Sequence, residues 1–263
     1  MRISTIIPVY KNFDELNEFE KVSINRTIEL MVDNVTFIGP AYLKNTYCSY
    51  YKNIDYNAFD KRYFQSIDGY NKLLKSIYFY RKFNNYTHIL IAQTDTWIFG
   101  SAIELLNFTG FDFSGAISYH LGEPYGFNGG LSLRNVQSSI TALKSLRNYE
   151  SPLEIWRRHF PGIKLLKLHK IISLLLDLTI RKKVHYRLNF FTKCNEDIFW
   201  SELVPKAVPN FNVISAEEAI KFSWEHNCEE FEKKHGLPFG CHGWWNYNYN
   251  FWEKIINLDE REN

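Results

Sequence analysis

In the first part of the chain, short apolar runs alternate with segments of helical periodicity. Ile3–Pro8 is almost entirely apolar and stops at a proline, which is typical of a buried parallel strand that ends at a turn. Asp14 and Glu15 then open a segment with apolar residues at helical spacing as far as about Val32, and acidic residues in a first turn favour a helix. The same two patterns predict strands at 35–38 and 87–92 and a helix at 69–82.

This order of strand, helix, strand, helix, strand predicts an α/β fold. We expect a Rossmann-type, three-layer α/β/α arrangement around a mostly parallel central sheet. Ligands of such sheets bind beyond the carboxyl ends of the strands. Two strand ends are therefore candidate binding segments: Pro8, Val9 and Tyr10 after the first strand, and Gln93, Thr94 and Asp95 after the third.

The second part of the chain has a looser pattern. Strands are predicted at 111–117 and 131–133, and four glycines and a proline predict a loop between them, at 118–130. The remaining predictions are helices at 136–147 and 197–203, a strand at 211–214, and an irregular, aromatic tail at 236–252. Because no repeat or linker interrupts the pattern, we expect a single domain over 1–263.

Composition narrows the function classes. A hydrophobic content of 45% with 23% charged residues is globular, and a net charge of +2 gives no support for a nucleic-acid partner. The four cysteines form no CxxC pair, which favours reduced thiols in a cytoplasmic protein. Aromatic residues make up 17% of the chain, which is explained either by codon bias or by a surface that stacks on sugars or bases.

One segment, 163–187, differs from the rest in charge. It carries seven basic residues and one acidic residue, and its polar positions form a narrow stripe beside a wide apolar face. Such a helix suits an anionic membrane interface, and one expectation is therefore a cytoplasmic protein bound peripherally to the inner face of the membrane. A core helix with one solvated edge, or a homodimer face, is the alternative. No stretch reaches 18 uninterrupted apolar residues, so no membrane span is predicted.

Two motifs place polar or small residues beside predicted strands. In QTDTW, Asp95 can hold a divalent cation that bridges two phosphates, since Mg²⁺ and Mn²⁺ take one or two carboxylates plus substrate oxygens. Capping of the next turn explains the same aspartate without a ligand. In FNGGLSLRN, Gly129 and Gly130 permit either close approach of a ligand to the backbone or an ordinary turn.

Two later motifs carry further candidates. CNEDIFW places Glu196 and Asp197 before an apolar run, so the pair supplies either a general base or a capped helix start. LPFGCHGWW carries Cys241 and His242, but with no second pair at ligand spacing a zinc site is only weakly indicated and a packed histidine is the simpler interpretation.

Taken in order, IPVYK, FxxxxGYNKLL, ILIAQTDTWIF, FNGGLSLRN, CNEDIFW, EEAIKFSWE and LPFGCHGW resemble one family of uncharacterised, predicted glycosyltransferases, similar to nucleotide-sugar enzymes of the GT-A fold. The resemblance covers roughly 3–118, 126–136 and 194–245. It implies a GT-A-like domain with a nucleotide-binding half at 1–98 and an acceptor-binding half at 99–263. The basic segment, taken as a helical element at 151–190, is not covered.

The resemblance also implies roles for single residues. QTD resembles the DxD motif, with Gln93 in the first position, and NED resembles the xED motif, with Asp197 as base and Glu196 as a neighbour that binds hydroxyls. The other implied roles are nucleotide binding by Pro8, Val9, Tyr10, Asn71, Gln93, Thr94 and Asp95, sugar binding by Asn128, Gly129, Gly130, Trp244 and Trp245, and binding of Mn²⁺ or Mg²⁺ by Asp95 and His242.

The implied activity is transfer of a sugar, with inversion, from a nucleotide-sugar donor to a glycan or lipid-linked glycan acceptor. A UDP-linked donor and a place in bacterial surface polysaccharide assembly, such as O-antigen assembly, are expected. Two alternatives stay open. One is a catalytically inactive nucleotide- or carbohydrate-binding protein of the same fold, which Gln93 favours. The other is a phosphohydrolase-like enzyme, which the lack of a P-loop motif disfavours.

Overall fold

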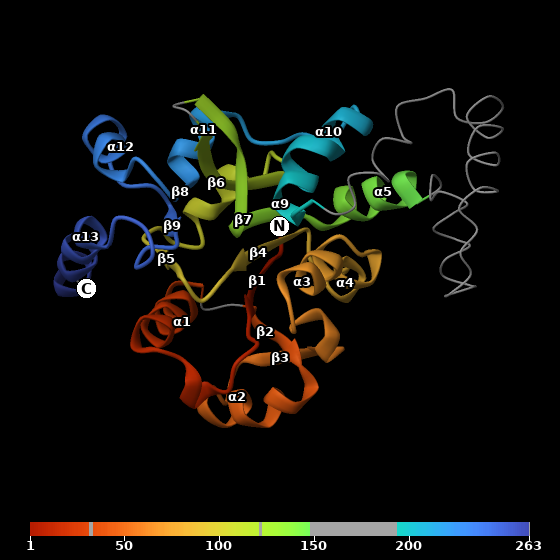
Figure 1. Ribbon diagram of the computed structural model, residues 1–263, viewed down its shortest axis with the longest axis horizontal. Helices are drawn as coiled ribbons and strands as arrows, with labels where there is room; N and C mark the ends of the chain where they lie inside the picture. Colours follow the sequence, from red (N-terminus) through yellow and green to blue (C-terminus); the bar gives the residue numbers. More distant parts are fainter. Residues whose placement is uncertain (32–33, 121–122, 148–193, 263) are drawn as a thin grey trace, which may run out of the picture.

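The computed structural model describes residues 1–31, 34–120, 123–147 and 194–262 (Figure 1). The basic segment 163–187, and the element at 151–190 that contains it, lie outside the described residues. Among the described residues, no helix combines the length and the apolar character that crossing a membrane requires.

The described residues form a nine-stranded sheet in the order β3-β2-β1-β4-β7-β6-β8-β9-β5. Five of its eight strand pairings are parallel, which agrees with the predicted mostly parallel sheet. The strands are β1 (Ile3–Pro8), β2 (Val35–Pro40), β3 (Asp55–Phe59), β4 (His88–Ala92), β5 (Thr96–Ile98), β6 (Phe113–His120), β7 (Glu123–Asn135), β8 (Ser223–Trp224) and β9 (Gly240–His242).

The sheet curls back on itself. Four strands lie between β4 and β5 in the sheet order, yet only residues 93–95 join these two strands in the chain. So short a link requires the far edge of the sheet to return to the end of β4. Gln93 N donates to Gly130 O at 2.9 Å, and Thr96 pairs with His242, so 93–95 bridges the two parts of the sheet.

Helices cover both faces of the sheet, which confirms the predicted three-layer arrangement (Figure 1). One face packs on α1, α2, α11, α12 and α13, and the other on α3, α4, α5 and the 199–204 segment. The helices are α1 (Glu18–Leu30), α2 (Lys44–Tyr50), α3 (Ile67–Leu74), α4 (Ile77–Lys82), α5 (Val136–Arg147), α9 (Glu196–Ile198), α10 (Val204–Ala207), α11 (Ala216–Phe222), α12 (Cys228–His235) and α13 (Tyr249–Glu262).

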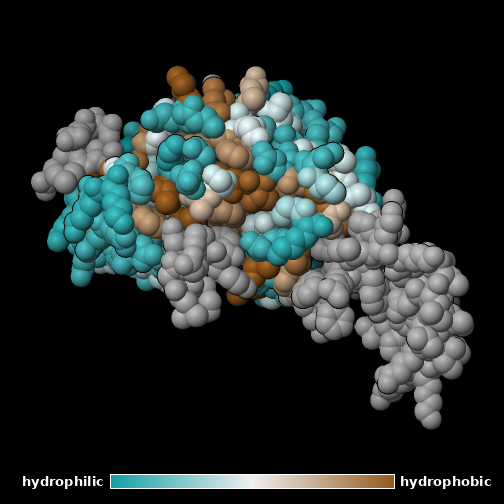
Figure 2. Space-filling view, turned by 90° about the horizontal axis from the view of Figure 1, so that it is seen from above, coloured by the Kyte–Doolittle hydropathy of each residue, from teal (hydrophilic) through white to brown (hydrophobic). Residues whose placement is uncertain are grey.

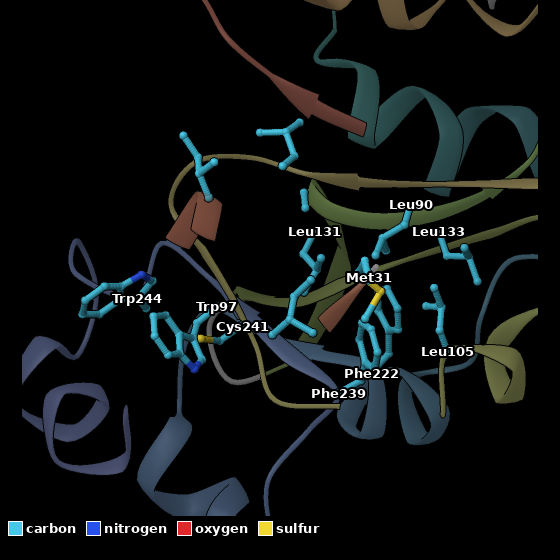
Figure 3. Close-up of a cluster of buried hydrophobic side chains, with 14 of the residues drawn as sticks. Met31, Leu90, Trp97, Leu105, Leu131, Leu133, Phe222, Phe239, Cys241 and Trp244 are labelled. Carbon is cyan, nitrogen blue, oxygen red and sulfur yellow. The ribbon is translucent and has the colours of Figure 1, made fainter. Parts of the chain in front are cut away.

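Strand alternation explains why both layers form. In β4, Leu90 points into the core that contains α1, whereas Ile89 and Ile91 point into the core that contains α3 and α4. A strand with apolar residues on both faces must be covered on both faces to keep them from water. Figure 3 shows part of the first core, to which Leu90, Trp97 and Phe222 all belong.

Several boundaries differ from the sequence prediction. The predicted helix at 69–82 is two helices, because Ser76 Oγ accepts from Phe79 N and starts a new one. The predicted loop at 118–130 is largely strand, because β7 pairs with β6 and takes up its glycines in an irregular register. The sequence did not predict strands β3, β5, β8 and β9 or helices α2, α11, α12 and α13, and the strand predicted at 211–214 is a single bridge from Val213 to Phe113. Helix α1 begins at Glu18, four residues later than predicted, because Asn17 caps it.

Candidate active site

A cavity of about 690 Å³ opens beyond the carboxyl ends of β1 and β4. It collects the motifs that are far apart in the sequence. Of the residues with an expected role, those that line it are Pro8, Tyr10, Asn71, Gln93, Thr94, Asp95, Asn128, Gly129, Gly130, Glu196, Asp197, His242 and Trp245. Val9 and Trp244 do not: both are buried in the apolar core, and Val9 N donates to Ile38 O at 2.8 Å.

His242 stands between two carboxylates on the cavity wall. Its Nε2 lies 3.3 Å from Asp95 Oδ1, and its Nδ1 lies 3.2 Å from Glu225 Oε1. Burial by itself lowers the pKa of this imidazole, but the hydrogen bonds to Asp95 and Glu225 outweigh it and raise the pKa to about 10. For Asp95, burial acts to raise the pKa, and the hydrogen bond to His242 more than offsets this, so that the pKa is lowered. Without a metal, this histidine is therefore an imidazolium at neutral pH.

The donor atoms of Asp95 and His242 fit a divalent cation. Neighbouring ligands of an octahedral ion with bonds of about 2.1 Å are about 3 Å apart, close to the observed separation of Oδ1 and Nε2. Glu225 accepts from Nδ1 and so leaves Nε2 to face an ion once its proton is lost, the outer-shell arrangement that orients metal-binding histidines. Among the described residues no group of three or more such side chains surrounds one point, so substrate oxygens would complete the coordination.

The paired glycines pack directly against these acidic and basic groups. A Cβ on Gly130 would collide with Nε2 of His242, and one on Gly129 would collide with Oε1 of Glu196. Asn128, in the same strand, contacts the carboxylate that holds His242, because its Nδ2 donates to Glu225 Oε1 at 3.3 Å. The absence of side chains at Gly129 and Gly130 therefore lets β7 pack closely against both Glu196 and His242.

Asp197 faces the cavity from the start of α9. Its side chain is half-buried, and burial raises its pKa to about 6, with the negative charge of Glu196 acting in the same direction. One oxygen, Oδ1, accepts from Ile198 N at 2.7 Å. A carboxylate with a pKa near 6 is a stronger base than an ordinary aspartate and is still ionised at neutral pH, which suits proton abstraction from a hydroxyl.

Glu196, in contrast, is bound on both oxygens. Arg134 NH1 lies 2.7 Å from Oε2 and NH2 lies 2.9 Å from Oε1, in a pair that is almost completely buried. Arg134 is also held by Tyr80 OH at 3.3 Å and by Ser132 Oγ at 3.0 Å. Both carboxylate oxygens of Glu196 thus contact Arg134, although the residue also lines the cavity.

Asn71 is likewise engaged with the chain around Asp197. Its Oδ1 accepts from Glu196 N at 3.0 Å, and its Nδ2 donates to Asn195 Oδ1 at 3.1 Å. A side-chain amide that holds the first residues of α9 fixes the direction in which Asp197 points. Although Asn71 lines the cavity, both ends of its amide are used within the protein.

The aromatic residues around His242 divide between core and cavity. Trp244 lies beside Trp97 in the core (Figure 3), and its Nε1 donates to Ser23 Oγ at 2.9 Å. Trp245 lines the cavity and stacks on the partly exposed ring of Phe19, with the ring centres 5.8 Å apart. Over the face seen in Figure 2, hydrophobic residues reach the surface as patches between hydrophilic ones.

Sequence reasoning gave no role to four charged residues near the site: Lys11, Glu20, Arg134 and Glu225. Three of them lie inside motifs that were recognised, namely Lys11 in IPVYK, Arg134 in FNGGLSLRN and Glu225 at the end of EEAIKFSWE. Their positions inside these motifs were the only sign in the sequence that they belong to the site. Their partners, however, lie in other parts of the chain: Lys11 and Glu20 are 9 positions apart, Glu225 and His242 are 17 apart, and Arg134 and Glu196 are 62 apart.

A family model described as "Protein of unknown function (DUF5672)" matches residues 53–242, well over half of the chain. The chain belongs to this family. The match spans the motifs from FxxxxGYNKLL to the histidine of LPFGCHGW, and the predicted membership of an uncharacterised family is confirmed. A search of curated proteins by sequence finds no match.

Solved structures to which this member of the DUF5672 family is similar include three described as glycosyltransferases or xylosyltransferases. One is a glycosyltransferase involved in the glycosylation of the major capsid of PBCV-1, 10% identical, with a TM-score of 0.44, covering 92% of this chain and 93% of that one. Mouse Xyloside xylosyltransferase 1 is 11% identical, with a TM-score of 0.47 and coverages of 92% and 97%. The glycosyltransferase GlyE from Streptococcus pneumoniae TIGR4 is 10% identical, with a TM-score of 0.42 and coverages of 92% and 54%. These likenesses are distant, so function has to be inferred from the cavity.

Proposed function

We propose that this protein is a GT-A-like glycosyltransferase that moves a sugar from a nucleotide-sugar donor to a hydroxyl of a glycan acceptor. The observation that carries the proposal is the set of side chains that line one cavity. Asp197, a carboxylate with a pKa raised to about 6, lines the same cavity as the Asp95–His242 pair at the end of β4. Sugar transfer needs both functions, a base for the acceptor and a site that stabilises a leaving diphosphate.

The reaction that fits is a single displacement. The acceptor hydroxyl gives its proton to Asp197, its oxygen forms a bond to the anomeric carbon, and the bond from that carbon to the diphosphate breaks, with the electron pair leaving on the diphosphate. Attack opposite to the leaving group inverts the anomeric configuration. Asp197 acts as base rather than nucleophile in this scheme, so no covalent sugar–enzyme intermediate is formed.

The charge of the cavity supports a divalent cation as cofactor. Among the described lining residues, Glu20, Asp95, Glu196 and Asp197 are acidic. Glu196 is paired with Arg134 and Glu20 with Lys11, so the remaining carboxylates, Asp95 and Asp197, face the cavity with His242 as their cationic neighbour on Asp95. A nucleoside diphosphate would add further negative charge to this wall. When bound by Asp95 and His242, Mn²⁺ or Mg²⁺ would supply Lewis-acid stabilisation of the diphosphate.

The acceptor is proposed to be a glycan or a lipid-linked glycan, as in bacterial surface polysaccharide assembly, and the donor a UDP-sugar. Support for a sugar comes from Trp245, a partly exposed aromatic residue that lines the cavity, since aromatic rings stack well on sugar rings. Support for a membrane-bound acceptor is the basic composition of 163–187, which implies a cytoplasmic, peripheral location. Flotation with anionic lipid vesicles tests that location.

The decisive experiment compares Asp197→Asn with wild type in two assays. With a panel of UDP-, GDP- and CMP-sugars and saccharide acceptors, we expect sugar transfer by wild type and a loss of roughly 10²- to 10⁴-fold in kcat for the variant. Binding of the nucleoside diphosphate should stay within about twofold of wild type, because Asp197 lies opposite to the diphosphate in this scheme.

Glu202→Gln is the matched control, because Glu202 follows closely on the same segment and pairs at the surface with Lys206. It should keep full activity. Undiminished transfer by Asp197→Asn would remove Asp197 from the base role. Nucleotide binding by wild type without transfer to any acceptor would favour the inactive binding protein instead.

A further inference from the structure

Lys11 holds a special position in the cavity. It follows β1 by three residues, so it lies at the carboxyl edge of the central strands, where ligands of such sheets bind. Within the part of the chain that the structure describes, it is the one lysine or arginine among the residues that line the cavity. Its side chain is 36% exposed.

A buried carboxylate fixes the ammonium group in place. Lys11 Nζ lies 2.9 Å from Oε1 and 3.0 Å from Oε2 of Glu20, which is 3% exposed. Lysine side chains at surfaces usually gain little from an ion pair, because they lose side-chain freedom in forming it. Here the partner is rigid, so the ammonium is held at one point before any ligand arrives.

Glu20 is itself tied to the end of β4. Its Oε1 accepts from Thr94 Oγ1 at 3.2 Å, and its Oε2 accepts from Asn17 N at 3.0 Å. Because Thr94 directly precedes Asp95, this chain of contacts relates the position of Lys11 to that of the Asp95–His242 pair. An ammonium has three donors, and one carboxylate does not use all of them.

We propose that Lys11 binds a phosphate oxygen of a nucleoside diphosphate in this cavity, with Glu20 as its positioning residue. The inference rests on the proposed function for the identity of the ligand. It adds to that function a second point that binds the diphosphate, placed by β1 and α1 and distinct from the Asp95–His242 pair. A compact ammonium charge at a preset position suits a phosphate oxygen.

The test is calorimetric binding of uridine, UMP, UDP and inorganic pyrophosphate at a fixed Mn²⁺ concentration. Lys11→Met should weaken UDP and pyrophosphate binding by roughly 10- to 100-fold, the range for a hydrogen bond to a charged group, and leave uridine binding unchanged. Lys11→Arg should keep most of the UDP affinity, and it also covers the case in which the methionine variant does not fold.

Lys21→Met is the matched control. Lys21 is a lysine of α1 that pairs with Glu18 at the surface, 2.8 Å away, and it does not line the cavity. It should bind all four ligands as wild type does. In wild type, the affinity for UDP should fall more steeply with added salt than in Lys11→Met, because one charge contact is missing in the variant.

The outcomes separate this inference from the function on which it rests. Equal losses for uridine and UDP, or no loss at all, would overturn the role of Lys11 while leaving a glycosyltransferase possible. Binding of pyrophosphate but of no nucleotide, with the Lys11→Met loss intact, would support the phosphate site and contradict the nucleotide-sugar donor. If wild type binds neither, the inference is wrong.

Discussion

Arg134 contacts both carboxylate oxygens of Glu196, at 2.7 and 2.9 Å, with the two side chains only 1% and 6% exposed. The pair joins β7 to the first residue of α9, directly before Asp197. The sequence resemblance implied that Glu196 binds substrate hydroxyls. The observed contacts show that its carboxylate also supports the segment that carries Asp197.

This buried pair should be costly to break from one side only. Arg134→Met leaves a buried carboxylate without its partner, and we expect it to lose about 3–5 kcal/mol of unfolding free energy. The double variant Arg134→Met/Glu196→Met removes both charges and should recover most of that loss. Urea denaturation of the single and double variants measures both values. A double variant no more stable than the worse single one would contradict the prediction.

The pH dependence of sugar transfer should report Asp197. Because the base must be ionised, and its pKa is raised to about 6, kcat should rise with pH through about pH 6 and level off above pH 7. A profile of initial rates from pH 4.5 to 8.5 with saturating donor checks this. An acidic limb centred near 4, the range of an ordinary aspartate, would speak against Asp197 as the group that titrates.

The same raised pKa has a cost in stability. The pKa of Asp197 is about 6 in the folded state against 3.8 for an ordinary aspartate, so its ionisation opposes folding increasingly as pH rises from about 4 to 6, and fully above that. Asp197→Asn should therefore be more stable than wild type at pH 8, by about 1–3 kcal/mol. The gain should vanish near pH 3.5. Denaturation at both pH values provides the comparison, and a gain that is independent of pH would point to another cause.

Gly130 should be intolerant of a side chain. A Cβ there meets the imidazole of His242, which cannot move aside easily because Asp95 and Glu225 hold it from both ends. We expect Gly130→Ala to lower transfer activity by roughly tenfold or more, as small displacements in an active site do. Gly110→Ala is the matched control, because nothing lies within 4 Å of a Cβ at that position, and it should retain activity.

Removal of divalent cations should weaken nucleoside diphosphate binding. The lining residues that the structure describes carry more carboxylates than cations, so a diphosphate without a metal would meet net repulsion. Addition of EDTA to wild type should lower UDP affinity by roughly tenfold or more, and Asp95→Asn should reduce the sensitivity to EDTA. Unchanged UDP affinity after chelation would mean that protonated His242 and Lys11 bind the diphosphate without a divalent cation.

The elements that the sequence predicted well are those set by local patterns. The bounds of β1 and α5 agree with the prediction, because uninterrupted apolar runs and helical spacing are readable without knowledge of partners. Strands β5 and β9 were missed because each has only three residues, too few for a pattern, and they form by pairing with each other. Glycines misled the prediction at 118–130, where strand pairing outweighed their turn preference.

The candidate site was predicted in part for a similar reason. Strand ends and acidic motifs are local signals, and they drew attention to Asp95 and Asp197. The sequence does not show which of the two adjacent carboxylates, Glu196 or Asp197, forms an ion pair within the protein. That depends on Arg134, which reaches Glu196 only in the folded chain, just as the orientation of His242 depends on Glu225.

The three residues 93–95 connect strands that stand far apart in the sheet order, and this has a consequence for how the site tolerates change in length. An inserted residue here would shift Thr96 out of register with His242 and would turn Asp95 away from the imidazole at the same time. Elsewhere a loop can lengthen at little cost. At residues 93–95, the number of residues in the link therefore determines whether Asp95 and His242 face each other.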